Sequence, residues 1–151
     1  MRKLKLEELN RVTLSEFKKR KKTPLIVVLE NIRSLNNVGT IFRTCDAFNV
    51  EAIYLIGITA KPPHREIHKT ALGATESVEW EYFRTSEEAI YKLKSNDFKL
   101  LSIEQAEGSI PINELSKINC DKMALFFGNE ISGVNQDTIN KSDFCLEVPQ
   151  F

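Results

Sequence analysis

The 151-residue sequence has little cysteine and no long hydrophobic segment. Its three cysteines, Cys45, Cys120 and Cys145, are widely spaced and form no Cys-x-x-Cys pair, which argues against a disulfide framework or a zinc site and favours a reducing compartment. No window of about 20 apolar residues could cross a bilayer. The charged N-terminus also lacks the apolar core of a secretory signal. We therefore predict a cytoplasmic protein without a membrane partner.

The sequence also lacks a net charge, with 21 basic and 21 acidic side chains. Without an overall field that attracts nucleic acid, any anionic partner has to be bound locally. The densest basic run, residues 18–22, ends a predicted first helix that opens with a Thr-x-x-Glu capping box at 13–16. Two interpretations of this run stay open. It is either a solvated helix end that complements its own dipole, or a phosphate-contacting patch formed by Lys18, Lys19 and Arg20.

Short hydrophobic runs alternate with helical patterns along one domain-sized chain that can bury a core of its own. Runs that are apolar at consecutive positions are typical of strands buried on both faces. Their alternation with helices indicates an α/β fold with a parallel sheet flanked by helices. The predicted strands are 24–31, 52–57, 98–104, 123–128 and 144–149, with 77–83 as an edge strand. The predicted helices are 37–49, 65–71, 86–95 and 134–141.

The helix after the first strand combines a glycine and an arginine one turn apart, Gly39 and Arg43. A glycine inside a helix costs about 0.8–1 kcal/mol, so something should need to come close to it. Either another backbone or a ligand could do so, and the forked donors of Arg43 would then overhang the contact. An ion pair between Arg43 and Asp46 on a solvated face remains an alternative. Asn36 or Asn37 could cap this helix or offer an amide to a ligand.

A second glycine-containing segment follows the strand at 123–128. Gly128 and Gly133 flank the pair Asn129-Glu130 at a predicted strand-to-helix turn. The segment lacks the Gly-Lys-Ser/Thr ending of a phosphate-binding loop and the spacing of a dinucleotide fingerprint. It is either a tight loop that holds a small ligand or a partner, or an ordinary strand-to-helix turn.

Two histidines one helical turn apart, His64 and His68, could both contact one metal ion. In an H-E-x-x-H motif the glutamate directly follows the first histidine, whereas here an arginine does. No third ligand is evident. We predict no metal site.

Together, these segments resemble the SpoU class of SPOUT RNA methyltransferases, the TrmH-like enzymes that methylate ribose 2′-hydroxyls with S-adenosylmethionine. The first family motif, N-x-G-x-x-x-R, resembles residues 37–43, and the second, G-N-E-x-x-G, resembles 128–133. Residues 68–76 also resemble the family, and Val148-Pro149 resembles the start of its third motif. The sequence stops before the Ser-Leu-Asn-Val that continues this motif. We therefore expect the natural chain to continue for roughly 20–30 residues.

The resemblance implies a SPOUT-type knotted α/β domain over residues 24–151, incomplete without its tail, after a basic helical segment at 1–23. It also implies an RNA 2′-O-methyltransferase with S-adenosylmethionine as cofactor, tRNA or rRNA as partner, and a homodimer. The cofactor-binding residues implied are Ile103, Glu104, Gly128, Asn129, Val148 and Pro149. The catalytic residues implied are Arg43, Asn37 and Glu130.

The resemblance also gives Arg43 a role at the target ribose. Because arginine stays protonated in proteins, we expect it to orient the 2′-hydroxyl and stabilise the developing alkoxide rather than act as a free base. Two other functions stay open. One is a non-catalytic RNA-binding or assembly protein that kept the fold, and the other is a flavodoxin-like nucleotide-binding domain, which the glycine pattern fits poorly.

Overall fold

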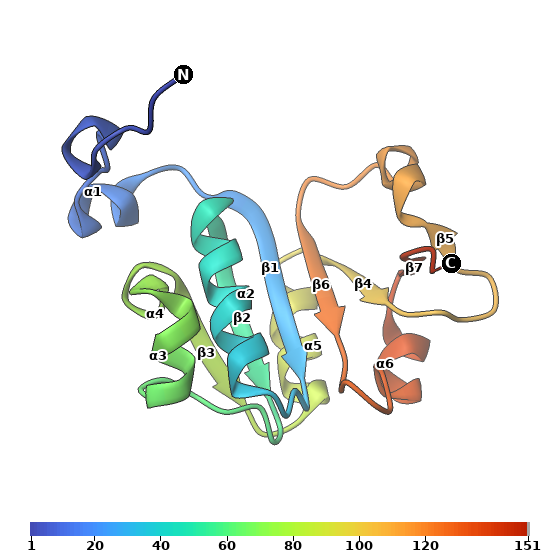
Figure 1. The fold of residues 1–151 in the computed structure, drawn as a ribbon. Helices are drawn as coiled ribbons and strands as arrows, with labels where there is room; N and C mark the ends of the chain where they lie inside the picture. The colour runs from blue at the N-terminus through green and yellow to red at the C-terminus, as the bar shows by residue number, and fades with distance from the viewer. Residues whose placement is uncertain (151) are drawn as a thin grey trace.

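A fully parallel sheet forms the centre of the computed structural model, which describes residues 1–150. The strands lie in the order β3-β2-β1-β6-β4-β7-β5, and every neighbouring pair is parallel (Figure 1). Consecutive apolar residues in most of these strands allow burial on both faces, as predicted. The strands are β1 (Thr23–Glu30), β2 (Val50–Ile56), β3 (Glu79–Phe83), β4 (Lys99–Ile103), β5 (Ile110–Pro111), β6 (Met123–Phe127) and β7 (Phe144–Glu147).

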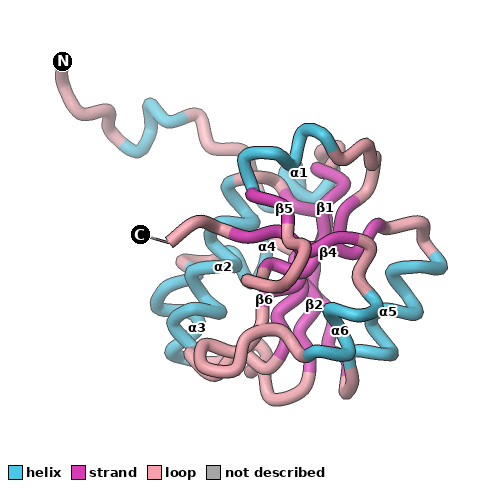
Figure 2. The backbone as a smooth tube through the Cα atoms, turned by 90° about the vertical axis from the view of Figure 1, so that its right-hand side faces the viewer, coloured by secondary structure: helices cyan, strands magenta, loops and turns pink. Residues whose placement is uncertain are grey.

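Helices flank the sheet in two layers. Figure 2 shows α2 and α3 on one side of the strands and α5 and α6 on the other. The α-helices are α1 (Leu14–Lys19), α2 (Leu35–Ala47), α3 (Arg65–Ala71), α4 (Ala74–Ser77), α5 (Ser86–Ser95) and α6 (Gln136–Lys141). Two 3₁₀ helices, η1 (Leu6–Leu9) and η2 (Ile112–Lys117), complete the helical elements.

Each helical layer has its own hydrophobic core. On the α2 side, Val38 and Phe42 are fully buried against β1 and β2, because the apolar stripe of α2 faces the sheet. On the α5 side, Leu93 packs with Leu100 and Phe126 of two central strands. The predicted α/β class with a parallel sheet is therefore confirmed.

Most predicted elements occur with small shifts at their ends, and the helices at 65–71 and 86–95 have the predicted bounds. The predicted edge strand is β3, at one end of the sheet. The prediction that Asn36 or Asn37 caps α2 was wrong, because the Ser34 hydroxyl accepts the Asn37 N–H at 3.2 Å. The short elements α4 and β5 were not predicted.

Gly39 lets two helices approach each other. A Cβ atom there would lie 2.4 Å from the Ile67 carbonyl oxygen and 2.0 Å from the Thr70 hydroxyl of α3. Of the two alternatives for this glycine, close approach of another backbone is the one that the structure shows, and the ligand alternative is wrong. The helix pair α2–α3 thus fixes the position of Arg43, which lies one turn further along.

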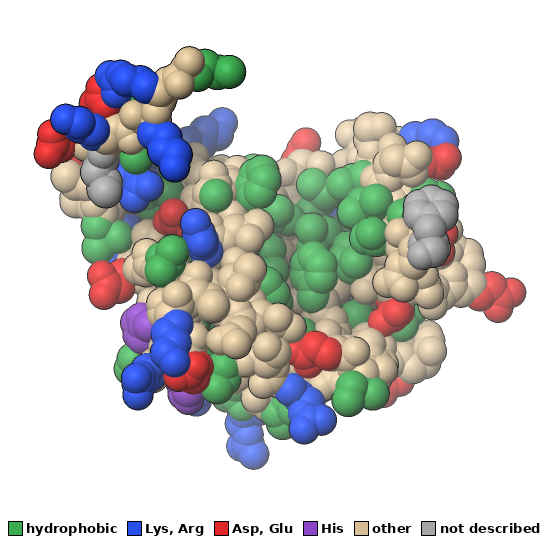
Figure 3. Space-filling view, in the orientation of Figure 1, with side chains coloured by type: hydrophobic (Ala, Val, Ile, Leu, Met, Phe, Trp, Pro, Cys, Tyr) green, Lys and Arg blue, Asp and Glu red, His purple; other side chains and the backbone are tan. Residues whose placement is uncertain are grey.

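One half of the sheet lacks a helix on the α2 side. The side chains of Leu25 on β1 and of Met123, Leu125 and Phe127 on β6 are only half-buried there. Figure 3 shows the hydrophobic side chains gathered between α2 and the segment that carries η2 and β5. We call these four residues the open face. An apolar surface of this kind is typical of an interface.

Candidate functional site

The loop between β6 and α6 forms a small closed turn at the carboxyl edge of the sheet. The N–H and C=O groups of Asn129 and Gly133 pair with each other at 3.0 and 2.9 Å. Gly128 faces this turn so closely that a Cβ atom would lie 2.1 Å from the Val134 nitrogen. The Asn129 side-chain amide donates to the Asn31 carbonyl oxygen at 2.8 Å. The loop is therefore a fixed structure attached to the end of β1, and both glycines are needed for its shape.

The Glu130 carboxylate ties this loop to the start of α2. It accepts the backbone N–H groups of Arg33 and Ser34, both at 3.0 Å, and the Asn37 side-chain amide at 3.2 Å. Asn37 and Glu130 belong to two separate sequence motifs, and the structure brings them into contact. Their contact joins the first and second motifs at the boundary between β1 and β6.

Electrostatics favour the ionised form of Glu130. Desolvation by partial burial raises its pKa, but the hydrogen bonds from Arg33, Ser34 and Asn37 outweigh that effect and leave the pKa below its ordinary value. Glu130 is thus a charged acceptor that holds the two motifs together, and this geometry suits a supporting role better than proton transfer.

Two further carboxylates hold the other end of the loop. Glu104, just after β4, accepts the Val134 N–H at 2.9 Å. Gly133 has a φ of +69°, and a Cβ atom there would meet the Glu104 carboxylate at 2.1 Å. Glu30, at the end of β1, is fully buried and accepts the Asn135 N–H at 2.8 Å and the Thr138 hydroxyl at 2.6 Å, together with the Ser86 hydroxyl. A buried charge needs such partners.

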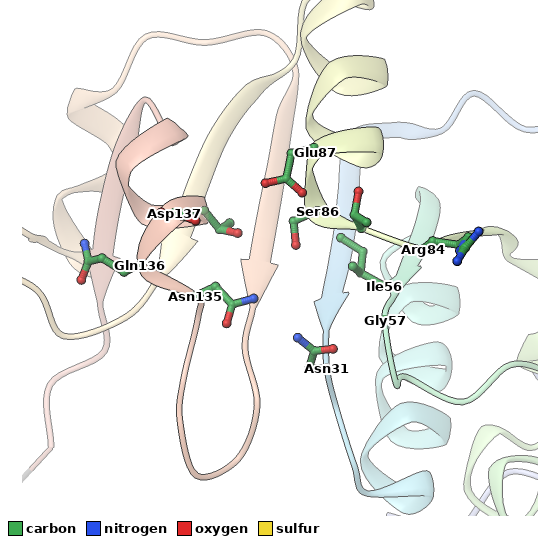
Figure 4. Close-up of a pocket in the computed structure, with 11 residues that line it drawn as sticks. Asn31, Ile56, Gly57, Arg84, Ser86, Glu87, Asn135, Gln136 and Asp137 are labelled. Atoms are coloured by element: carbon green, nitrogen blue, oxygen red, sulfur yellow. The ribbon is translucent and has the colours of Figure 1, made fainter.

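A polar cleft lies beside Glu30, between the first turns of α5 and α6. Figure 4 shows Ser86 and Glu87 on one side of it, Asn135 and Asp137 on the other, and Asn31 below. Its volume is about 430 Å³. None of the predicted site residues lines it. Sequence reasoning also missed Glu30, although a charged residue that ends a run of five apolar ones was a signal for a buried, paired carboxylate.

The predicted cofactor residues lie at the carboxyl ends of neighbouring strands, where parallel sheets bind ligands. Ile103 ends β4 and Glu104 follows it, and Gly128 and Asn129 follow β6. Val148 and Pro149 follow β7, whose Leu146 is paired with Ile103. The β4, β6 and β7 ends therefore share one edge of the sheet, as the sequence predicted.

A hollow of about 640 Å³ opens beside two of these strand ends, between the 104–107 and 131–140 segments. Ile131, Val134 and Ile139 give it apolar walls, and Glu104 and Glu107 give it carboxylates. S-adenosylmethionine combines an adenosine with a cationic sulfonium and an amino-acid end that carries an ammonium and a carboxylate group, so its net charge is positive. Apolar walls with acidic groups fit such a cation, and the volume lies within the ~300–1,000 Å³ of ordinary ligand pockets.

Arg43 lies in a different depression from this hollow. It lines a groove between α2, the α3–α4 turn and the N-terminal segment, together with Arg20. Within residues 1–150 its side chain forms no ion pair or hydrogen bond, and Asp46 instead accepts the Ser77 hydroxyl. Arg43 and the hollow beside Glu104 therefore lie in separate depressions of this chain. The alternative ion pair with Asp46 is not formed.

The basic run after residue 17 is divided by the structure. Lys18 forms an ion pair with Glu79 at 3.5 Å, and neither Lys18 nor Lys19 lines the groove. Arg20, just past the end of α1, does line it. Only one of the three predicted phosphate contacts thus joins Arg43.

The two histidines that were weighed as metal ligands, and not predicted to be such, have other contacts. His64 caps α3, because its Nδ1 atom accepts the Glu66 N–H at 3.2 Å. His68 Nδ1 lies 3.5 Å from the Thr75 hydroxyl. Over residues 1–150, no three His, Cys, Asp or Glu side chains are arranged to hold a metal ion. Across the same residues, no helix is long and apolar enough to cross a membrane.

The strand ends of this parallel sheet border a ligand-sized hollow. Beside it, two loops are joined by residues of the two sequence motifs. These features are typical of a ligand-binding α/β domain. The chain belongs to the SpoU rRNA Methylase family, whose model matches residues 24–151. This assignment agrees with the resemblance that the two motifs indicate.

Three similar proteins illustrate the relationship. A tRNA (guanosine(18)-2′-O)-methyltransferase of Borreliella burgdorferi is 25% identical over 127 residues, which cover 84% of this chain and 56% of the relative. The crystal structure of an A. aeolicus TrmH/SpoU tRNA modifying enzyme has a TM-score of 0.77 at 22% identity, covering 91% of this chain and 68% of that one. An AdoMet-bound rRNA methyltransferase from Sinorhizobium meliloti has a TM-score of 0.77 at 22% identity, covering 89% and 51%. The chain thus spans little more than half of two of these proteins.

Proposed function

We propose that this protein is an RNA ribose 2′-O-methyltransferase that uses S-adenosylmethionine and acts on tRNA or rRNA in the cytoplasm. Family membership supports this function, as do the printed names of the relatives. The observation that carries it is Arg43, an arginine of the first motif whose guanidinium has no partner among residues 1–150 and lines an exposed groove. An arginine kept only for stability would be expected to pair with Asp46.

S-adenosylmethionine supplies an activated methyl group when it is bound. Of the six predicted cofactor residues, only Glu104 lines the hollow. We propose that Glu104 holds the ligand and that the others support it from the adjacent strand ends: Ile103, Gly128, Asn129, Val148 and Pro149. Glu104 offsets the positive charge of the ligand. Glu104 also fixes Val134, so that this side of the hollow keeps its shape.

Arg43 binds and orients the target ribose. As the 2′-hydroxyl loses its proton to a phosphate oxygen of the RNA, negative charge develops on the ribose oxygen, and the guanidinium stabilises it. The guanidinium would hold this oxygen in place to accept the methyl group that bound S-adenosylmethionine would supply. Asn37 and Glu130 act as positioning residues, because they join the start of α2 to the 128–135 loop.

We also propose a homodimer in which two chains share each site. Arg43 and the hollow at Glu104 lie in separate depressions of one chain. The open face supplies an apolar surface between α2 and the η2–β5 segment for a second copy (Figure 3). A symmetric dimer would let the α2 groove of one chain face the hollow of its partner.

The substitution Arg43→Ala tests the activity. We expect methyl transfer from labelled S-adenosylmethionine to total tRNA and rRNA to fall at least ~100-fold, the loss typical of one removed oxyanion donor. Calorimetric affinity for S-adenosylhomocysteine should stay within about twofold, because Arg43 lies outside the hollow. Arg43→Lys should also be poor, since a point charge cannot replace the planar fork. Full activity of Arg43→Ala would contradict the proposal, as would RNA binding without any methyl transfer by the wild-type protein.

Mixing two inactive variants tests the shared site. Ile131 is 83% exposed and lines the hollow, so Ile131→Arg should exclude a cationic cofactor without unfolding the chain. Random pairing of this variant with Arg43→Ala should restore about a quarter of the wild-type activity, because half the dimers then contain one intact site. A mixture that stays inactive would show that each site belongs to a single chain.

A further inference from the structure

The groove that contains Arg43 has a second wall made by the N-terminal segment. Arg11 and Arg20 lie on this wall, and Arg43 lies on α2 opposite them, in a groove of about 630 Å³. The resemblance to the family pointed to Arg43, and the basic run pointed to Arg20. Arg11 was not predicted, because it stands alone in the sequence. The fold alone brings the three guanidinium groups to one groove.

None of the three arginines forms an ion pair within the part of the chain that the structure describes, although the Glu16 carboxylate lies near enough to Arg20 for a charge interaction. The ion pairs found there involve other residues, and the one acidic side chain that lines the groove, Asp46, accepts a hydrogen bond from Ser77. The groove therefore carries three positive charges against one negative charge. A protein with no net charge concentrates positive charge at this place, which suits local binding of a polyanion.

Apolar side chains line the same groove. Val12, Leu14 and Leu72 are 37%, 46% and 65% exposed, although large apolar residues are usually buried. Guanidinium groups bind phosphates, and apolar or aromatic surfaces bind the faces of unstacked bases. Paired bases keep their faces inside a helix, so this combination favours unpaired RNA over a duplex.

The N-terminal wall is attached to the domain. The Lys22 ammonium group donates to the Asn49 side chain at 2.8 Å and lies 3.7 Å from the centre of the Phe17 ring. The Asn49 amide in turn donates to the Lys21 carbonyl oxygen at 2.8 Å, and Lys18 pairs with Glu79. Arg20 is therefore held near α2, and RNA does not have to order a free segment in order to bind.

We propose that this groove binds an unpaired stretch of RNA next to the target nucleotide, with Arg11 and Arg20 contacting its phosphates. The inference rests on the proposed function, because it takes Arg43 as the residue at the target ribose. It adds that the N-terminal segment selects RNA in which the target is unpaired. An acidic segment of another protein is the competing occupant.

Fluorescence anisotropy tests the groove without the cofactor. The probes are a fluorescein-labelled ten-nucleotide oligouridine and a ten-base-pair RNA duplex, each titrated with full-chain protein at several KCl concentrations. The wild type should bind the single strand more tightly than the duplex. The double variant Arg11→Ala/Arg20→Ala should lose roughly tenfold in affinity for the single strand. Its plot of log affinity against log salt should be shallower by about 1.4, or ~0.7 for each lost phosphate contact.

A matched variant removes the same charge elsewhere. Arg2 belongs to the N-terminal segment but pairs with Glu8, and Lys94 lies at the end of α5. Arg2→Ala/Lys94→Ala should bind the oligouridine within about twofold of the wild type. Leu72→Glu, at a well-exposed position, should weaken binding through repulsion and leave the thermal melt unchanged.

The outcomes separate this inference from the proposed function. If the groove variants bind the oligouridine as well as the wild type does, the groove inference is wrong, even if Arg43→Ala abolishes methyl transfer. Tight binding of a labelled oligoglutamate with no binding of oligouridine would also overturn it, in favour of an acidic protein partner. If the groove variants lose RNA binding while the wild type transfers no methyl group, the groove stands and the proposed enzymatic function fails.

Discussion

The two halves of the sheet are built differently. β3 and β2 have helices on both faces, whereas β6 is covered by a helix on one face only, and β1, which carries Leu25 of the open face, lies between them (Figures 1 and 2). In the covered half, packing fixes side chains, and even a glycine is needed so that α2 and α3 can approach. In the other half, hydrogen bonds that carboxylates accept hold the loops. Rigid packing thus supports the arginine groove, and polar contacts shape the hollow.

The boundary between the halves lies at β1 and β6. Glu30 and Asn31, at the end of β1, contact residues of the loop that follows β6. Glu130 reaches back from that loop to the start of α2. These contacts join elements that are about 100 residues apart in the sequence. The relative position of the two motifs therefore depends on this boundary.

The largest difference in stability loss should come from truncating one aliphatic side chain to alanine in each half of the sheet. Ile53 in β2 is fully buried, whereas Leu125 in β6 belongs to the open face. We expect Ile53→Ala to lower the free energy of unfolding by about 4 kcal/mol and Leu125→Ala by about 1 kcal/mol, because a cavity forms only in the covered half. Urea unfolding at low protein concentration measures both. Equal losses would mean that the open face is covered in the monomer.

Removing the Glu30 carboxylate should lower the free energy of unfolding nearly as much as Ile53→Ala does. Glu30→Leu leaves the Asn135 N–H and the Thr138 and Ser86 hydroxyls without their acceptor, which we expect to destabilise the protein by about 3 kcal/mol, at ~1–3 kcal/mol for each buried group. The total lies at the low end of the sum for three groups, because the two hydroxyls can rotate and find other hydrogen-bond partners. Urea unfolding followed by circular dichroism checks the value.

Glu30→Gln is the control for this prediction. The amide keeps the shape and one carbonyl acceptor, and its NH₂ group can donate to the two hydroxyls. It should therefore lose less than half as much stability as Glu30→Leu. If the glutamine and leucine variants were equally unstable, the charge itself would be required rather than the hydrogen bonds.

A smaller loss is expected at the contact between α2 and α3. Gly39→Ala places a Cβ atom against the Ile67 carbonyl oxygen, which cannot move without its helix, so we expect a loss of about 2 kcal/mol, within the ~1–3 kcal/mol typical of overpacking. The control is Thr40→Ala, an exposed position on the same helix. A stabilised Gly39→Ala variant would show that helix propensity outweighs the close contact.

The sequence predicted the elements of both halves, because alternation of apolar runs with helical patterns depends on local physics. Two motifs in the sequence also led us to propose Asn37, Arg43 and Glu130 as site residues. The contact between Asn37 and Glu130 depends on the neighbouring positions of β1 and β6, which no local pattern contains. The role of Gly39 was left undecided for the same reason, since its neighbour, α3, lies more than 25 residues further along the chain.

The separation of Arg43 from the Glu104 hollow also lay beyond what the sequence shows. The sequence showed that Gly39 and Arg43 share a helix face, and they do face the same neighbour, the α3–α4 region. It could not show that this face lies away from the Glu104 hollow, because that depends on which side of the sheet α2 covers. The groove with Arg11 and Arg20 needs the N-terminal segment to fold back onto α2, which depends on long-range contacts such as that between Lys22 and Asn49.

The smallest expected effect is the pH-dependent contribution of Glu130 to the free energy of unfolding. Its pKa is lower in the folded chain than its ordinary value of 4.5, so its contribution to stability is complete above that value and is lost as the pH falls through the folded pKa. Glu130→Gln should therefore cost less than about 1 kcal/mol near pH 7, since the group is exposed and screened by solvent, and progressively less below pH 4.5. Urea unfolding of both proteins between pH 3 and pH 7 measures the difference. A gap that widens on acidification would mean that Glu130 is protonated more easily in the folded chain, and that the hydrogen bonds from Arg33 and Ser34 do not hold the two halves as described.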